Sequence, residues 1–524
     1  MPRATLSYNS ASPLLKSVPG SYPYRGEILC NRALNMSKIK AVGFDMDYTL
    51  AMYNSEQFET LSATLALEKL VNVLRYPKEL LSVQYDHSYF IRGLVVDKER
   101  GNIIKLDRHK YVKRALHGFK VLSKEERTDI YDQITKSGGG FAEPRFAVLD
   151  AMFALPDAFL FGSVVQYKDD HPGEIAQDYK QIYRDVRSSV DMCHRDGSIK
   201  DLVAKEPKRF ILRDPSLIPM LRKLKRSGRK VFLLTNSLWN YTDTVMSYLY
   251  EEGENGRWID LFDVIITGSA KPAFLLNPRL PLFRCDPADG TLRNTEGVYG
   301  ESAEEYLSRG KCFQGGNYTH LHDMLSVSNG TQLLYVGDHI YSDVLRTKRT
   351  LGWRTMLIVP ELEHEINTLY DEKTRSLREE IEEMRDKRND IDEWVDRLEG
   401  ELVSDENVTP ARSAHVRQEL STARKELQSS REQIGTRVEE YHGRFHRIWG
   451  QLFKTGMQNS RFAEQVENYA CLYTSRVTNI GLVSPEMYWR AMNDLMPHDR
   501  LSKSPMYRVL SRRAEPGCSK FVDE

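Results

Sequence analysis

Five short apolar runs recur along the first 360 residues, and each has the length of a β-strand. They are residues 39–44, 230–234, 264–266, 333–336 and 356–359. Such runs are typical of buried parallel strands, although a short run alone does not exclude a buried helix. Helix-like stretches at residues 217–226 and 243–250 lie on either side of the second run. The alternation predicts an α/β fold with a doubly wound parallel sheet, which binds ligands beyond the carboxyl ends of its strands.

Long insertions divide this pattern. About 185 residues separate the first two runs, which is too many for one crossover, so we expect a separate inserted module there. A second long excursion, rich in Gly, Asn and Pro around residues 277–318, predicts loops with a small hairpin. The expected divisions are an amino-terminal arm at 1–37, a catalytic core at 38–55 and 205–360, the insert at 56–204, a helical coiled-coil hairpin at 361–454, and a carboxyl-terminal helical segment with a tail at 455–524.

The hairpin is predicted from two series of apolar residues at heptad spacing, separated by a Ser-, Asp-, Asn- and Pro-containing break at 404–413. Residues 361–404 carry 16 acidic and 7 basic side chains, whereas residues 411–454 carry 5 acidic and 9 basic ones. Opposite charge and a short connection favour an antiparallel pair of helices. Such an arm is either a solvated projection or a contact in a homo-oligomer.

Composition limits the classes of function. Apolar residues make up 40% of the chain and charged residues 28%, which suits a folded core. The net charge of zero argues against a generally basic nucleic-acid binder, and no apolar run of 18 residues predicts a membrane span. The first 40 residues lack an apolar signal-peptide core, and six scattered cysteines without a CxxC pair indicate reduced thiols. We therefore expect a cytoplasmic protein.

Polar residues that could take part in catalysis or phosphate binding follow the strand-like runs. Asp45 and Asp47 end the first run in FDMDYTL, where one carboxylate can attack as a nucleophile and the other can serve as acid and base. A lone DxD is weak evidence, because acidic residues are common in turns. The second run ends in Thr235, Asn236 and Ser237, whose hydroxyl and backbone N–H groups suit a phosphate or, equally, a helix N-cap.

Two further runs add charged groups. Lys271 follows the third run and could neutralise a phosphoryl group, although an isolated lysine is usually solvated. The fourth run ends in GDHIYSD, in which Asp338 and Asp343 follow a glycine. Carboxylates from two strand ends make an oxygen-rich site of the kind that Mg²⁺ prefers.

The ordered set DxD, T-N-S, K and G-D-x4-D matches the four motifs of the haloacid-dehalogenase-like (HAD) phosphatase superfamily. More closely, the chain resembles the cytosolic purine 5′-nucleotidase (IMP/GMP-specific) family over roughly residues 28–495. The lines that carry the resemblance include KIKAVGFDMDYTLAMY, RGLVVDKERGNIIKLD, YRDVRSSVDMCHRDGSIK, KVFLLTNSLWNYTD, LLYVGDHIYSDVLRTKRTLGWRT and RFAEQVENYACLY.

The resemblance implies roles for these residues. Asp45 would form an aspartyl-phosphate, and Asp47 would protonate the leaving 5′-oxygen and later activate water. Asp45, the Asp47 carbonyl and Asp338 would bind Mg²⁺, with Asp343 in support. The phosphoryl oxygens would be held by Thr235, Asn236, Ser237, Lys271 and Lys200.

The insert would act as a cap that supplies the base pocket. Arg187 and Asp191 would read a 6-oxopurine, with Phe153 stacking on the base and His194 beside it. The plainer interpretation of Arg187 and Asp191 is an i,i+4 ion pair on a helix. Ala154 and Arg195 stand where the family pattern has an asparagine and an aromatic residue, which leaves another base preference open.

The family also forms tetramers and binds nucleotide effectors, so a homo-oligomer, either a dimer or a tetramer, and an effector site at Tyr341 with Val148 and Asp150 are expected from the resemblance. Phosphotransfer to another nucleoside is a further family expectation. The leading hypothesis is a Mg²⁺-dependent nucleotidase acting on 6-oxopurine nucleoside monophosphates. The alternatives are a phosphatase for another small phosphate ester and a non-catalytic scaffold acting through the coiled-coil arm.

Overall fold

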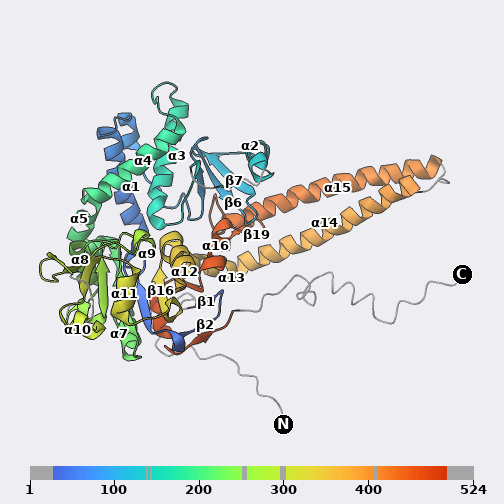
Figure 1. The fold of residues 1–524 in the computed structure, drawn as a ribbon. Helices are drawn as coiled ribbons and strands as arrows, with labels where there is room; N and C mark the ends of the chain where they lie inside the picture. The colour runs from blue at the N-terminus through green and yellow to red at the C-terminus, as the bar shows by residue number, and fades with distance from the viewer. Residues whose placement is uncertain are drawn as a thin grey trace, which may run out of the picture.

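A computed structural model describes residues 27–136, 140–141, 144–250, 256–295, 302–404 and 410–491 (Figure 1). Within these ranges ten strands form one sheet, in the order β1-β20-β17-β16-β3-β11-β12-β15-β13-β14. Seven of the described strands run parallel: β3 (Ala41–Phe44), β11 (Lys230–Leu234), β12 (Val264–Thr267), β15 (Cys312–Gly315), β16 (Leu333–Gly337), β17 (Arg354–Ile358) and β20 (Leu472–Thr474). The predicted doubly wound α/β fold is confirmed.

Helices cover both faces of this sheet because side chains alternate along each strand. On β11, Val231 and Leu233 belong to one core cluster, together with apolar residues of α7 (Leu217–Arg226) and α8 (Trp239–Leu249). Phe232 and Leu234 belong to a second cluster on the opposite face. That second face is covered by α9 (Ala273–Leu276), α10 (Ala303–Ser308) and α11 (Tyr318–Leu325).

The segment between β3 and β11 is a mixed module. Its five described sheet strands lie antiparallel in the order β8 (Lys120–Val121), β7 (Val112–His117), β6 (Asn102–Leu106), β5 (Val95–Asp97) and β9 (Phe146–Val148). Its helices are α1 (Ser55–Asn72), α2 (Lys124–Lys136), α3 (Leu155–Asp170), α4 (Tyr179–Arg195), α5 (Ser198–Lys205) and α6 (Pro207–Phe210). A pair of short strands, β4 (Met52–Tyr53) and β10 (Ile211–Leu212), closes the module where it leaves and rejoins the core.

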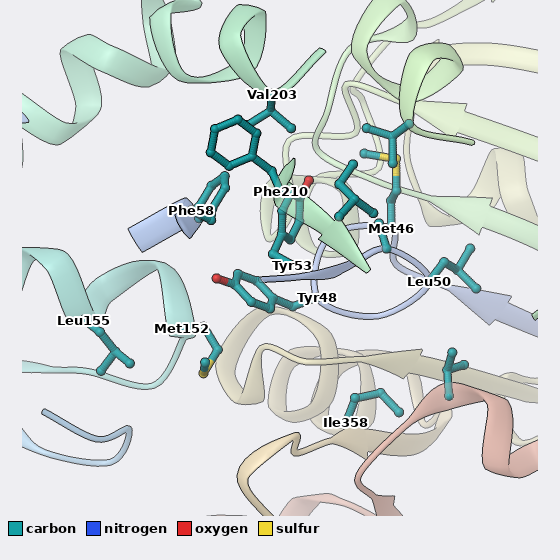
Figure 2. Close-up of a cluster of buried hydrophobic side chains, with 14 of the residues drawn as sticks. Met46, Tyr48, Leu50, Tyr53, Phe58, Met152, Leu155, Val203, Phe210 and Ile358 are labelled. Atoms are coloured by element: carbon teal, nitrogen blue, oxygen red, sulfur yellow. The ribbon is translucent and has the colours of Figure 1, made fainter. Parts of the chain in front are cut away.

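Aromatic packing attaches this module to the end of β3. Tyr48 extends from the loop after β3 and Tyr53 from β4 (Figure 2). The ring centroid of Tyr53 lies 4.6 Å from that of Phe58 in α1. Val203 of α5 and Phe210 of α6, from the carboxyl-terminal part of the module, pack against the same cluster (Figure 2). The cluster therefore fixes the module directly above the carboxyl edge of the sheet.

A long helical hairpin projects from the core (Figure 1). Helix α14 (Glu372–Ser404) and helix α15 (Pro410–Gly443) pack through a cluster of described apolar residues that includes Val395, Leu398, Val416 and Leu427. At 1.5 Å per residue each helix is about 50 Å long. The predicted break at 404–413 falls partly outside the described residues. The second helix ends earlier than its apolar series, at Gly443, and a separate helix, α13 (Glu361–Tyr370), precedes α14.

Both ends of the described chain differ from the expected division. Residues 28–30 form β1, which pairs with β20, and residues 34–35 form β2, which pairs with β21 (Tyr488–Trp489). The arm expected at 1–37 therefore contributes an edge strand, and its remainder at 1–26 lies outside the described residues. Residues 455–491 contain more than the expected helical segment. They include α16 (Arg461–Tyr469) and also β20, which belongs to the central sheet. A short antiparallel pair, β18 (Lys454–Thr455) and β19 (Gln458–Asn459), precedes α16.

The expected hairpin within residues 277–318 is present as β13 (Leu282–Cys285) and β14 (Leu292–Asn294), at the sheet edge beside β15. The parallel strand β15 in the same stretch was not predicted. Among the described residues no helix is long and apolar enough to cross a membrane.

Candidate active site

Asp45 lies at the carboxyl end of β3, between β16 and β11. Its backbone N–H donates to the Val336 carbonyl at 2.9 Å, which extends the strand pairing by one residue. Its Oδ1 accepts the Met46 N–H at 2.8 Å, and its Oδ2 lies 3.1 Å from Lys271 Nζ. Burial raises the pKa of Asp45 to about 7, while Lys271 opposes this shift and Asp343 and Asp47 add to it.

Asp45, Asp338 and Asp343 form an acidic triad. One carboxylate oxygen from each lies within 4.8 Å of the others. Asp338 directly follows β16, and Asp343 lies in a π-helical turn, Ile340–Leu345. A Cβ on Gly337 would come within 2.5 Å of Asp343 Oδ2, so only glycine lets that carboxylate reach the triad.

The triad fits a divalent cation. Asp338 is 2% exposed, and its Oδ2 has no hydrogen-bond partner among the described residues. Burial, with Asp343 and Asp45 nearby, raises the pKa of Asp338 well above its usual value. A buried oxygen without a partner is costly, and a hard cation with oxygen ligands removes that cost.

Lys271 neutralises the other side of the triad. Its Nζ donates to Asp343 Oδ1 at 2.8 Å and to the Tyr335 hydroxyl at 2.7 Å. Burial alone would lower the pKa of Lys271, but Asp343 and Asp45 raise it well above the usual value. The ammonium group is therefore charged and held beside Asp45.

Asn236 braces the loop that carries this lysine. Its Oδ1 accepts the Lys271 N–H at 2.6 Å and the Ser269 hydroxyl at 2.9 Å, and its Nδ2 donates to the Lys271 carbonyl at 3.2 Å. Asn236 also lines the cavity described below. Thr235 is fully buried, and its hydroxyl accepts the Ser237 N–H at 3.1 Å. The Thr235 side chain thus shapes the turn, whereas Ser237 reaches the reaction site.

Hydroxyl groups hold both oxygens of the Asp47 carboxylate. Tyr53 donates to Oδ1 at 2.6 Å, and Ser237 donates to Oδ2 at 2.8 Å. Lys200 Nζ donates to Ser237 Oγ at 3.2 Å, and the Tyr53 and Tyr241 hydroxyls lie 2.8 Å apart. Asp47 is therefore fixed in orientation beside Asp45. Neither tyrosine was predicted from the sequence.

A cavity of about 920 Å³ opens from this edge of the sheet towards the inserted module. Asp47, Ser237 and Lys200 line its inner end, and Phe153, Arg187 and His194 also line it. The Phe153 and His194 rings lie 6.4 Å apart at 83°, and Phe153 packs edge-on against Tyr48 at 4.8 Å. Burial, followed by the charges of Lys200 and Arg187, lowers the pKa of His194.

Arg187 is shared between two carboxylates. Its Nη2 donates to Asp191 Oδ1 at 2.8 Å, which is the helix ion pair weighed from the sequence. Its Nη1 donates to Asp157 Oδ2 at 2.6 Å. The Asp157 side chain is only 2% exposed, its Oδ1 has no partner among the described residues, and burial raises its pKa to about 6 although Arg187 opposes the shift. Asp157 was missed, but an acid inside the apolar stretch LPDAFLFG was a usable signal.

The two departures from the family pattern lie in different places. Ala154, which stands where the expected family pattern has an asparagine, lines the cavity. Arg195 donates to the Asp191 carbonyl at 3.4 Å and is not among the residues that line the cavity. The residues expected at an effector site, Tyr341, Val148 and Asp150, line this same cavity, and Arg461 Nη1 lies 3.5 Å from Asp150 Oδ1.

Residues 28–501 match the model of the 5′ nucleotidase family. A 5′-nucleotidase domain-containing protein of Dictyostelium discoideum is 30% identical over 87% of this chain and 71% of its own length. The 5′-nucleotidase domain-containing protein 2 of Rattus norvegicus is 28% identical over 86% of this chain and 76% of its own length. A solved structure described as a predicted phosphoglycolate phosphatase of Haemophilus somnus is 12% identical, with a TM-score of 0.26, over 62% of this chain and 86% of its own.

Proposed function

The chain belongs to the 5′ nucleotidase family and is a phosphoric monoester hydrolase, and we propose that its substrates are 6-oxopurine nucleoside 5′-monophosphates. One observation carries the proposal. A single cavity is lined both by Asp47, Ser237 and Lys200, close to Asp45, and by Arg187 with its buried partner Asp157. The second partner of Arg187, Asp191, is bonded to it from outside the cavity lining. The first group suits a phosphate and the second suits a base.

Asp45 is the proposed nucleophile. A carboxylate oxygen of Asp45 attacks phosphorus, the bond from phosphorus to the 5′-oxygen breaks, and an aspartyl-phosphate forms. Asp47 gives its proton to the leaving 5′-oxygen, and then takes a proton from the water that hydrolyses the intermediate. The hydroxyls of Tyr53 and Ser237 keep the Asp47 carboxyl pointing to the reacting atoms.

Positive charge offsets the phosphoryl charge during both steps. Lys271 lies beside Asp45, and Lys200 and the Ser237 hydroxyl line the adjoining cavity. We propose that Asp45, Asp338 and the Asp47 carbonyl would hold Mg²⁺, with Asp343 behind them. When bound, the cation would offset charge on the equatorial oxygens, which is where a phosphoryl transition state carries it.

Arg187 and Asp191 are the proposed readers of the base. A 6-oxopurine presents O6 and N7 as acceptors and N1–H as a donor, which match a guanidinium and a carboxylate. The hydrogen bonds to Asp157 and Asp191 use only two of the five N–H groups of Arg187. Adenine presents an amine at position 6 and is expected to bind less well.

Four broader proposals follow from the family. The insert at 56–204 serves as the cap of the active site, and a nucleoside can replace water as phosphoryl acceptor. The hairpin of α14 and α15 takes part in a homo-oligomer. A nucleotide effector at Tyr341 would share the cavity with the substrate, and Asp150 would disfavour a polyphosphate there unless Arg461 offsets its charge.

The test is phosphate release from IMP, GMP, AMP, CMP, UMP and ribose 5-phosphate, with and without Mg²⁺. Asp45→Asn, which keeps the size of the side chain, is the chemical control. The proposal requires IMP and GMP to lead and Asp45→Asn to be inactive. If ribose 5-phosphate leads, the reaction stands and the base assignment is wrong. Ala154 in the cavity wall is the reason to test this alternative, because the family pattern has an asparagine amide at that position.

A further inference from the structure

The Arg92 guanidinium joins the inserted module to the edge of the core sheet. Its side chain is fully buried, and it comes from the residues just before β5. Nη1 donates to the Asp338 carbonyl at 3.0 Å, while Nε and Nη2 donate to the two carboxylate oxygens of Glu361 at 2.8 and 2.6 Å. Asp338 follows β16, and Glu361 is the first residue of α13. One side chain therefore ties together three segments.

The residue after Arg92 is a glycine that lets the chain pass close to α16. Gly93 has φ +81°, and a Cβ there would lie 2.5 Å from Phe462 Cβ in α16. The guanidinium carbon of Arg92 lies 5.4 Å from the centroid of the Phe462 ring. A residue with a side chain at position 93 would push the module away from α16, and Arg92 would move with it.

Charge alone does not explain the arrangement. Glu361 balances Arg92 through a bidentate pair, so the two together add little net charge beside Asp338. Arg92 fixes the backbone carbonyl of Asp338, and hence the direction of its carboxylate, whose Oδ2 has no hydrogen-bond partner in the described part of the chain. Groups behind the direct ligands orient those ligands, and their loss typically costs about 10-fold to 100-fold in metal affinity.

We propose that Arg92 is a positioning residue for the divalent-cation site, and that it makes cation binding depend on the seating of the inserted module. The inference rests on the magnesium site of the proposed function, but not on the identity of the substrate. It assigns a role to the RGLVVD segment, which contributes no side chain to the cavity.

The test measures cation binding without substrate. Mn²⁺, which also prefers oxygen ligands, is titrated into the full chain, and free Mn²⁺ is followed by electron paramagnetic resonance. Arg92→Lys keeps the charge but cannot reach the Asp338 carbonyl and both Glu361 oxygens together. Glu361→Gln weakens the same contact from the other side and serves if Arg92→Lys does not fold.

Arg229→Lys is the matched control. Arg229 is also buried, and its Nη2 donates to the Met36 carbonyl at 2.8 Å and to Glu486 Oε1 at 2.8 Å, before the amino end of β11. We expect Arg92→Lys to weaken Mn²⁺ binding by about 10-fold to 100-fold and Arg229→Lys to leave it unchanged. Equal Mn²⁺ affinity in Arg92→Lys and the parent overturns the proposal, as does an equal loss in both variants. A parent chain that binds no Mn²⁺ overturns the cation site itself, whereas a wrong substrate leaves this result untouched.

Discussion

Tyr53 donates a 2.6 Å hydrogen bond to Asp47, which lies six residues before it. The segment that joins β3 to the inserted module therefore holds the proposed acid and base in place through its own tyrosine. The same hydroxyl lies 2.8 Å from that of Tyr241 in α8, which anchors it from the core side. The Tyr53 ring packs on Phe58 of the inserted module. Seating of the module and orientation of Asp47 are thus connected through one side chain.

Replacing Tyr53 by phenylalanine is expected to lower kcat for the preferred nucleotide by roughly 10-fold to 100-fold, since a hydrogen bond to a charged group is lost. KM is expected to change little, because Tyr53 contacts Asp47 and not the base. Steady-state kinetics separate the two constants. Tyr241→Phe, which leaves the Tyr53–Asp47 bond in place, is the control and is expected to have the smaller effect. A rise in KM with unchanged kcat would contradict this role.

Mg²⁺ is expected to stabilise the folded chain, because it binds the acidic triad only when the triad is assembled. At roughly 100 times the dissociation constant, the free energy of unfolding should rise by about 2.7 kcal/mol. Thermal unfolding with Mg²⁺ or with EDTA measures the difference. Asp338→Asn removes one ligand and should abolish most of the Mg²⁺-dependent increase in Tm. An increase of equal size in Asp338→Asn would place the binding site elsewhere.

Asp157→Asn should raise KM for IMP by roughly 10-fold, because Arg187 loses a charged partner at 2.6 Å and with it a fixed orientation. The chemical step should change little, since Asp157 contacts neither Asp45 nor Asp47 among its described bonds. Ribose 5-phosphate, which has no base, is the control substrate, and its kinetics should be unaffected. Equal losses with both substrates would show a general disturbance of the cavity.

His446 is expected to make stability depend on pH. Its Nδ1 accepts the backbone N–H groups of Ile448 and Trp449 at 3.1 and 3.0 Å, and its Nε2 lies 2.8 Å from the Ser88 carbonyl. Burial lowers the pKa of His446 to about 4, the Ser88 carbonyl opposes the shift, and the nearby charges are Lys105, Arg447 and Asp86.

Because the unfolded chain binds a proton near pH 6.5 and the folded chain does not, the stabilisation is complete above pH 6.5 and is lost as pH falls to about 4. Allowing for partial exposure, the loss is about 2 kcal/mol. Urea unfolding at pH 7 and pH 5 measures it. His446→Asn keeps an acceptor without the titration, so its stability should fall less over this interval; an identical fall in parent and variant would exclude His446 as the cause.

Much of the fold could be predicted because buried parallel strands are continuous apolar runs, as at residues 230–234 and 333–336. Strands β15 (CFQG) and β20 (LYT) were missed because they are short and mixed in polarity, and only pairing with β12 and β17 makes them strands. The order of Asp45, Asp47, Lys271 and Asp338 along strand ends was readable from spacing, and their catalytic roles stay predictions.

The partners of those residues could not be read from the sequence. Arg92 and Glu361 are 269 positions apart, and Arg187 and Asp157 are 30 apart on different helices. Such contacts depend on how the module sits on the sheet, and no local pattern encodes that. Asn236 shows the same limit, since its side chain braces the Lys271 loop as well as lining the cavity.

The central place of β3 has a consequence for synthesis of the chain. β3 is made early, yet one of its neighbours, β16, begins at Leu333 and follows β11 at Lys230–Leu234. At about 5–20 residues per second, roughly 15–60 s pass between the emergence of β3 and that of β16. During this interval the strand that bears Asp45 has an uncovered edge and apolar faces. A ribosome-bound chain is therefore expected to need chaperone protection until about the first two thirds of the protein have been translated.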